Sequence, residues 1–545
     1  MLPLPRSIAE LIERRLAELT RDGHSLVRLA AVLGREFEGE LLSDAAALGD
    51  EATLDALEEL RRRQVLEEAG GGRLRFVHDK LREVAYGRME DKRRRALHHR
   101  AAEAVEHRHA TELPRHAAAL AHHWSQAGVH GRARHFFALA GDQARAAYAN
   151  HEAISFYEAA LREAAFPREA GASAQEAVPF AMERVHESLG DVLTLTGRQA
   201  EAREAYAQAL ARLAQHERVR RASIHRRVGK SWETHHQHEE ALSAYAAGEA
   251  ALETSPDELP EDVWQEWFQI QNERITTYYW QARVREMTEL VERVRPIVEQ
   301  RGAPPQRARF FQSIVQMRCR TERYRVSDVT VAYARALVQA SQESGVASEL
   351  TLARFVWATA LLFHDELAAS EALMRDVLAE AERVGDVTMQ SRCLTFLTIL
   401  HRRQGRVEET RRQASRGLEV ATAANMADYI GAAHANLGWV ARREGHTDEA
   451  GHRARTALEC WRPLSLVYPF QWMAHWPLMA LALEQNQTTA ALVHARALLD
   501  PAQQRMPDEL TGPLEHTTGG EPMPSERVRL ELAPVLEMAR QRGYL

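Results

Sequence analysis

Small and apolar residues recur at helical spacing along most of the chain, and the pattern is clearest in the stretch RVHESLGDVLTLTGRQAEAREAYAQALARL. Ala202, Tyr206 and Ala209 stand at positions i, i+4 and i+7, which form one face of an α-helix. Gly190, in the preceding segment, has no side chain and so lets a second helix approach this face closely. Gly197 lies between the two segments and suits a turn. The stretch therefore predicts a hairpin of two antiparallel helices.

The same pattern returns at intervals of about 40 residues. One copy contains Gly229 and Tyr245, and another contains Gly438 and Ala450. Degenerate or weaker copies occupy further segments, at 311–340, 355–377, 397–414 and 479–498. The order Leu-Gly, Gly, Ala, aromatic, Ala resembles the tetratricopeptide (TPR) repeat. Because one such repeat cannot bury its apolar face alone, the resemblance implies that the copies stack into a solenoid with a concave binding surface.

The first 108 residues do not follow this repeat. Apolar faces predict helices at about 5–19, 25–33, 40–47 and 53–63. Two short extended runs, 65–68 and 73–77, then flank three consecutive glycines, which predicts a β-hairpin. Helices followed by a small hairpin indicate a winged-helix domain. The predicted fold class is therefore all-α with a small β-wing, in which a winged-helix domain precedes a TPR-like α-solenoid.

Composition suggests where the domains begin and end. We expect the winged-helix domain at 1–108, the first helical hairpins at 109–165 and the TPR-like α-solenoid at 166–500. Prolines flank small residues at 166–179, which predicts a flexible joint. Residues 501–526 are rich in proline and glycine and are predicted to form a disordered loop. Residues 527–545 return to helical spacing and are predicted to cap the solenoid with a helix.

Three segments of the N-terminal domain carry a more specific resemblance: LPRSIAELIERRLAEL, LAAVLGREFEGELL and RFVHDKLREVAY. They are similar to the winged-helix segment of bacterial STAND proteins, the signal-transduction ATPases with numerous domains. In that family an NTPase core precedes the winged helix and a helical-repeat sensor follows it. The resemblance implies that this chain corresponds to the last two parts. Members of the family are often fused to serine/threonine kinases, cyclases or transcription regulators.

Val77-His78-Asp79 lies where the family carries a Met-His-Asp-like motif. The resemblance implies that His78 contacts the β-phosphate of ADP held by an NTPase domain and helps to maintain the off state. The alternative is that His78 caps or packs against the helix that follows. The Gly-Lys-Ser at 229–231 has Ile224 where a phosphate-binding loop requires glycine. We therefore expect no cofactor in this chain, and ATP or ADP only through an NTPase domain in cis or in trans.

Composition narrows the functional classes further. A net charge of −7 over 545 residues gives no global attraction to nucleic acid or to an anionic membrane. The chain has no run of 18 apolar residues and no apolar core of a secretory signal, so we expect a cytoplasmic protein with no membrane association. Cys319, Cys393 and Cys460 are widely spaced, which indicates a reducing compartment and no disulfide framework.

The charge balance of the N-terminal domain bears on DNA binding. The first 110 residues hold 20 basic and 21 acidic side chains. A winged helix that reads DNA is usually clearly basic. The balance therefore disfavours DNA as a partner.

Histidine is abundant, with 26 residues, and metal binding must be weighed for that reason. His235, His236 and His238 form the densest cluster, but no acidic or cysteine ligand stands at a matching spacing. The adjacent pairs His98-His99 and His122-His123 are weaker candidates, because neighbouring side chains on a helix point in different directions. Surface histidines are the preferred interpretation, and no metal ligand is predicted.

Aromatic residues concentrate in two segments, 264–280 and 461–476. Aromatic side chains fill solenoid cores, and they are also enriched at the centres of protein interfaces. Core packing is the preferred interpretation, and a ligand or partner surface is the alternative. The candidates for partner binding are Trp264, Trp267, Tyr278, Tyr279, Trp280, Trp461, Trp472 and Trp476. Local spacing assembles no set of catalytic residues.

The sequence favours a non-catalytic sensor or regulatory module of a bacterial signalling system. The TPR-like solenoid would bind a protein partner or a small inducer. The winged helix would relay this binding to an NTPase, kinase or cyclase domain in cis or in trans. One alternative is a fragment of a multidomain kinase or ATPase whose catalytic domains lie upstream. A second alternative is a DNA-binding transcription regulator.

Overall fold

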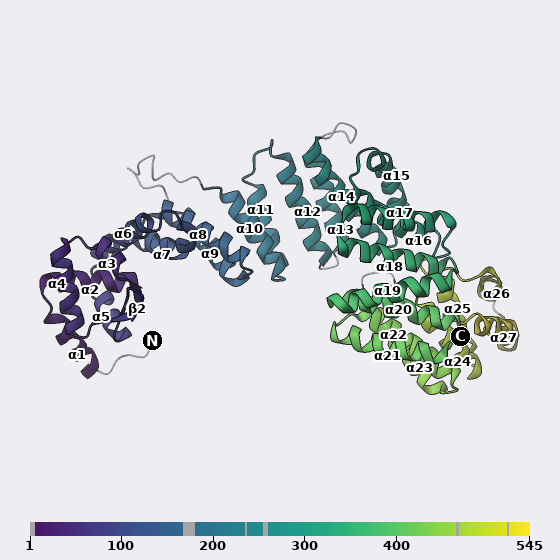
Figure 1. Ribbon diagram of the computed structural model, residues 1–545. Coiled ribbons are helices and arrows are strands. Elements are labelled where there is room, and N and C mark those ends of the chain that lie inside the picture. The colour runs from purple at the N-terminus through teal and green to yellow at the C-terminus, as the bar shows by residue number, and fades with distance from the viewer. Residues whose placement is uncertain (1–5, 167–179, 235–236, 254–259, 465–467, 520–522) are drawn as a thin grey trace. The chain divides into compact units, whose positions relative to one another are not determined.

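The computed structural model describes residues 6–545 except 167–179, 235–236, 254–259, 465–467 and 520–522 (Figure 1). The chain divides into two compact units, Met1–Glu217 and Arg218–Leu545, which we call the first and the second unit. Helices form nearly all of the described secondary structure, and the described strands form one small sheet. The predicted all-α class with a small β-element is confirmed.

The first unit contains, in chain order, α1 (Arg6–Ala17), α2 (Arg21–Leu33), β1 (Glu36–Glu38), α3 (Gly39–Ala45), α4 (Asp50–Arg62), β2 (Leu66–Gly70), β3 (Arg73–Phe76), α5 (Asp79–Gly87), α6 (Asp91–Arg108), the 3-10 helix η1 (Leu113–His116), α7 (Ala117–Ala127), α8 (His130–Ala146), α9 (Asn150–Ala164), α10 (Met182–Leu195) and α11 (Gln199–Leu210).

The second unit contains α12 (Arg218–Thr234), α13 (His238–Leu252), α14 (Glu261–Trp280), α15 (Val284–Arg301), α16 (Pro304–Thr321), α17 (Asp328–Ser344), α18 (Ala347–Phe363), α19 (Leu367–Val384), α20 (Val387–Arg403), α21 (Val407–Ala423), α22 (Ala427–Arg443), α23 (Thr447–Trp461), α24 (Trp472–Glu484), α25 (Thr488–Leu498), α26 (Asp508–Gly519) and α27 (Ser525–Gln541). None of the described helices is both long and apolar enough to span a bilayer.

The small sheet lies among the helices of the first unit and has the antiparallel strand order β1-β3-β2. The hairpin of β2 and β3 was predicted, and its turn uses three glycines that all have positive φ. Strand β1 was missed because it is only three residues long. Its Phe37 pairs with Leu74 of β3 and is buried with it. The sheet therefore presents one apolar face to the core of the helices around it.

The predicted helical hairpin is α10 with α11, and its closest contact joins a glycine to a tyrosine ring. A Cβ added to Gly190 would lie 2.6 Å from the ring of Tyr206, so only glycine fits there. Gly229 meets Tyr245 in the same way between α12 and α13. The pair α8 and α9 makes the same contact through Gly141, which meets the Tyr157 ring. The repeat pattern therefore encodes a recurring close approach of two helices.

Helices of the second unit pack in consecutive pairs, from α12 with α13 to α24 with α25. The first helix of a pair also contacts the first helix of the next pair, as α18 does with α20 and α20 with α22. This stacking of hairpins is the TPR-like α-solenoid that the repeats predicted. Seen in Figure 1, the helices α18 to α23 lie in layered rows.

The C-terminal part of the chain corrects one prediction. Residues 501–526 were expected to form a disordered loop, but α26 occupies Asp508–Gly519 within them. Leu510 and Leu514 of this helix are spaced four residues apart and are both buried, so burial of this apolar face outweighs the proline and glycine content. Helix α27 follows, as predicted for 527–545, and Tyr544 and Leu545 are also buried. The joint predicted at 166–179 lies almost wholly outside the described residues.

Arg402 of α20 ties this C-terminal part to the core. Its side chain is fully buried and donates hydrogen bonds to the carbonyl oxygens of Met473 at 3.3 Å, Gly543 at 3.2 Å and Tyr544 at 2.5 Å. Burial lowers the pKa of Arg402 to about 9, so the guanidinium stays charged at neutral pH. The buried guanidinium is therefore stabilised by one carbonyl oxygen of α24 and two at the C-terminal end of the chain.

Candidate functional site

The aromatic candidates divide into a buried majority and an accessible minority. The buried residues, none more than 9% exposed, are Trp264, Trp267, Tyr278, Trp461, Trp472 and Trp476. Their side chains fill the core, so they offer no open surface to a partner. Tyr279 is only half-buried and Trp280 is 37% exposed. The partner-binding alternative therefore concerns these last two residues.

Tyr279 and Trp280 line a cavity of about 190 Å³ in the second unit. The other walls come from the first helices of successive pairs and from the segment 468–470. The aromatic lining residues are Tyr279, Trp280, Tyr324, Phe355, Phe396, Tyr429, Tyr468 and Phe470. Every lining helix is the first of its pair, so the cavity lies on the side of the solenoid that these first helices form.

Aromatic rings from distant parts of the sequence form one wall of the cavity. The Phe470 ring centroid lies 4.8 Å from that of Tyr324 and 6.0 Å from that of Phe396. The Tyr279 and Tyr324 hydroxyl groups are 2.9 Å apart and form a hydrogen bond. These contacts fix the rings, so the wall is formed before any ligand arrives.

A few polar groups face the same cavity. Asp428 and Arg392 both line it, and Arg392 Nε donates a hydrogen bond to the Tyr429 hydroxyl at 3.3 Å. Burial raises the pKa of the Asp428 carboxyl above its usual range, although backbone hydrogen bonds and Arg392 oppose this shift. An apolar cavity with a small number of polar groups is the usual form of a ligand site. The polar pair can orient a ligand whose body packs on the rings.

Cys319 also lines the cavity but is unsuited to nucleophilic chemistry. Burial raises the pKa of its thiol to about 12, so the reactive thiolate is scarce at neutral pH. The residues around the cavity therefore favour binding rather than covalent catalysis.

His78 stands at the N-cap position of α5, directly after the sheet. Its side chain is exposed and makes no capping hydrogen bond. The side chain therefore does not cap the next helix, and its packing against that helix stays a prediction. Its contact with the nucleotide of an NTPase domain stays a prediction.

The Gly-Lys-Ser at 229–231 lies inside helix α12 and not in a phosphate-binding loop. Gly229 faces the Tyr245 ring, and the Lys230 ammonium contacts Glu233 at 2.8 Å and Glu273 at 3.0 Å. A phosphate-binding loop would expose successive backbone N–H groups, which a helix interior cannot do. This segment is accounted for by packing.

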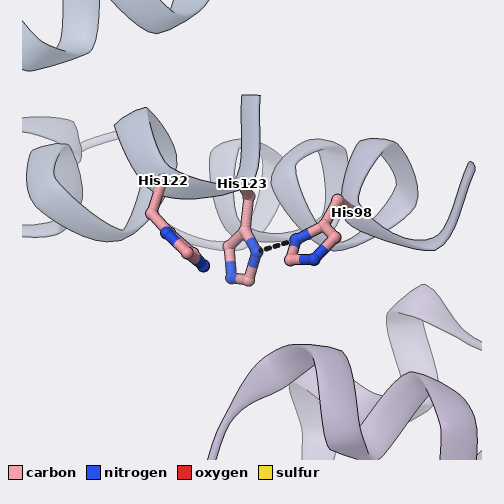
Figure 2. A group of neighbouring side chains, drawn as sticks. All are labelled: His98, His122 and His123. Carbon is pink, nitrogen blue, oxygen red and sulfur yellow. Dashed lines mark hydrogen bonds between the residues drawn. The ribbon is translucent and has the colours of Figure 1, made fainter. Parts of the chain in front are cut away.

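Three histidines of the two adjacent pairs, His98, His122 and His123, lie together in the first unit. Figure 2 shows His123 between His122 and His98, and the Nδ1 atoms of His98 and His123 are 2.9 Å apart. One nitrogen from each ring lies within 4.8 Å of the other two. The members of each pair differ in burial, since His98 and His123 are buried and His122 is exposed, but the packing of α6 against α7 brings His98 next to both histidines of the other pair. In the predicted cluster of histidines, His235 and His236 lie outside the described residues.

The sequence carried only part of the signal for either site. The two aromatic concentrations were interpreted as core packing, with a ligand or partner surface as the alternative, and nothing in them shows that Tyr279 and Phe470 line one cavity. The histidine pairs were visible, but nothing in their spacing shows that His98 faces His123 across two helices. The packing of the helices decides which residues line the cavity and which histidines lie together.

Comparisons with known proteins find similarity in fold only. No protein-family model matches the chain. No curated protein matches it either.

Solved structures of helical-repeat proteins do match. One is a STAND protein with a tetratricopeptide repeat sensor from Pyrococcus horikoshii, at 11% identity over 85% of this chain and 66% of that one, with a TM-score of 0.45. Another is a Rap protein complexed with competence and sporulation factor, at 8% identity over 68% of this chain and 98% of that one, with a TM-score of 0.45. A third is human IFIT1, at 14% identity over 66% of this chain and 78% of that one, with a TM-score of 0.38. Likeness at this level does not establish a shared function.

Proposed function

We propose that this chain is a non-catalytic sensor module whose second unit binds a protein partner or a small inducer in the aromatic cavity. The single observation that carries this proposal is the cavity itself. It lies on the first helices of successive hairpins, and fixed aromatic rings line it. Its position is the one that a solenoid offers to a ligand.

The size of the cavity limits what it can take. A buried cavity of about 150 Å³ accommodates a benzene molecule. At about 190 Å³, this cavity matches one aromatic or large aliphatic group, which could be a side chain of a partner or the body of a small inducer. Asp428 and Arg392 favour a group that carries or adjoins a hydrogen-bonding or charged function.

The N-terminal part of the first unit would be the relay. We infer that helices α1 to α5 with their small sheet act as a winged helix against an NTPase domain in cis or in trans. The exposure of His78 supports this role, because the side chain is free of capping bonds and can reach a partner. A ligand that binds one arrangement of the protein better than another would shift the population and change the NTPase state.

The binding half of the proposal can be tested by filling the cavity. Thr359 of α18 lines the cavity, and Thr351 of the same helix does not, so Thr359→Phe and Thr351→Phe form a matched pair. A library of short peptides that each contain one aromatic residue would be screened against the full chain by fluorescence anisotropy. We expect binders whose affinity falls at least tenfold in Thr359→Phe and stays within twofold in Thr351→Phe. Equal binding by both variants would contradict the cavity as the site.

The non-catalytic half needs a separate measurement. The purified chain is expected to show no ATP binding by calorimetry and no phosphate release above the buffer rate. Hydrolysis that survives further purification would overturn this half of the proposal and leave the cavity test untouched. A His78→Ala variant, assayed with an NTPase partner domain, is expected to weaken retention of ADP.

A further inference from the structure

His98, His122 and His123 form a compact group of imidazoles between two helices of the first unit. His98 lies on α6, and the other two lie on α7. The ring centroids of His98 are 5.6 Å from His122 and 5.2 Å from His123. Among the described residues, these three histidines form the group of potential metal ligands whose donor atoms all lie within 4.8 Å of one another.

The surroundings hold His98 in place. His98 is fully buried, and its Nε2 lies 2.8 Å from the Tyr86 hydroxyl. The other nitrogen, Nδ1, faces His123. Histidine ligands of metals commonly have the second ring nitrogen fixed by a hydrogen bond, which sets the tautomer and the ring orientation. Tyr86 occupies that supporting position here.

We propose that His98, His122 and His123 bind one divalent transition-metal ion of the zinc class, with a fourth coordination position left open. Imidazole suits zinc, copper, iron and nickel, and three histidines plus one exchangeable ligand form a known zinc arrangement. The site would join α6 to α7 through the ion.

The geometry requires only local adjustment. Two nitrogens bound to tetrahedral zinc are about 3.3 Å apart, since each Zn–N bond is about 2.0–2.1 Å. The present 2.9 Å between the Nδ1 atoms of His98 and His123 has to open slightly. Since all three nitrogens lie within 4.8 Å of one another, no separation has to close by more than about 1.5 Å. His122 is exposed and can make this movement by changing rotamer, and the same exposure gives the ion a path of entry.

One nearby positive charge, that of Arg94, is expected to weaken the binding of a metal ion. The guanidinium of Arg94 lies 5.6 Å from the Tyr86 ring centroid and, by its positive charge, contributes to the lowered pKa of His98. A cation in the site would feel the same repulsion. An Arg94→Gln variant is therefore expected to bind the ion about threefold to tenfold more tightly.

The test uses the full chain without a histidine tag, titrated with zinc chloride by calorimetry and with cobalt chloride by visible absorption. We expect one ion per chain and a cobalt spectrum of the intense tetrahedral type. His122→Gln removes an exposed ligand and should leave the fold intact, and it should weaken zinc affinity at least tenfold. His107→Gln, on the exposed side of α6, and His494→Gln, from the second unit, are matched controls that should leave affinity unchanged.

Two outcomes would overturn the proposal. The first is the absence of one-to-one binding at micromolar zinc in the wild-type chain. The second is binding that persists in His122→Gln and in His98→Gln but disappears when His235 and His236 are both replaced by glutamine. In that case the other sequence cluster would bind the ion, and the three rings would form only a buried hydrogen-bonding network.

Discussion

One helix pair in each unit closes on a contact between two histidine rings. Between α6 and α7, His98 Nδ1 lies 2.9 Å from His123 Nδ1. Between α24 and α25, His475 Nδ1 lies 3.1 Å from His494 Nδ1. Burial lowers the pKa of all four rings, so each pair is neutral at pH 7 and shares a proton in a hydrogen bond. In both places the contact satisfies polar atoms between packed helices.

The two pairs differ in what surrounds them. The pair in the first unit has a third ring, His122, which is exposed to solvent. In the second unit, residues Trp472 to Leu483 of α24 are all buried, and Arg402 donates to the Met473 carbonyl within the same core. The contrast teaches that a buried histidine contact is a packing device by default. It becomes a candidate ligand set where a third donor and an open side are added.

The largest expected loss of stability comes from removing Arg402, which lies in the same buried core as the second histidine pair. Arg402→Met would leave the carbonyl oxygens of Met473, Gly543 and Tyr544 without their donor, and we expect a loss of about 3 kcal/mol in the free energy of unfolding. Urea unfolding followed by hydrogen exchange of α24 measures it. The control is Arg416→Met, which removes an exposed ion pair with Glu382 and should cost about 0–1 kcal/mol. Equal losses in the two variants would mean that Arg402 contributes no more than a surface charge.

The second largest effect is expected from acid, which should destabilise the packing of α24 against α25 at the second histidine pair. The pKa of His475 is about 4 in the folded protein and about 6.5 in the unfolded chain, so the unfolded state binds more protons between these values. Stability is therefore retained above pH 6.5 and falls as the pH drops, by about 2 kcal/mol from His475 between pH 6.5 and 5. Hydrogen exchange of α24 at a series of pH values measures this slope. His475→Gln should flatten it, and an unchanged slope in that variant would assign the protons to other groups.

Helix pairs without a histidine contact sharpen the comparison. Gly190→Ala would push a methyl group into the Tyr206 ring, and we expect a destabilisation of about 1–2 kcal/mol. Gly417→Ala is the matched control, because its nearest neighbour atom, Leu394 Cβ, is 3.5 Å away and alanine favours a helix. We expect a gain of about 0.5–1 kcal/mol there. Thermal unfolding of both variants shows whether the two substitutions change the stability in opposite directions.

The smallest effect compares the two histidine contacts directly. His123→Gln and His494→Gln should each cost about 1 kcal/mol in chelated, metal-free protein, because each removes one hydrogen bond. Added zinc should stabilise the wild-type chain and His494→Gln, but not His123→Gln. Zinc stabilisation of all three proteins would place the ion elsewhere and remove the distinction between the two pairs.

Much of the fold could be predicted, because it follows from local rules. Helical spacing of small and apolar residues located the hairpin α10–α11, and consecutive glycines located the turn between β2 and β3. The error at α26 shows the limit of composition, since the buried Leu510 and Leu514, four residues apart on one helix, outweighed the proline and glycine around them. The aromatic segments contain residues that line the cavity, but their spacing could not separate Trp280, which lines it and is partly exposed, from Trp264 in the core.

The sequence by itself determined the repeat, the all-α class and the close approach of helices at Gly190 and Gly229, because these depend on side-chain size and spacing along a few turns. Only the tertiary structure decided that Tyr279 and Phe470 line one cavity and that His98 faces His123. Both juxtapositions join residues on different helices, and their distance depends on how those helices cross and stack. That packing is set by the whole core, so no local spacing encodes it.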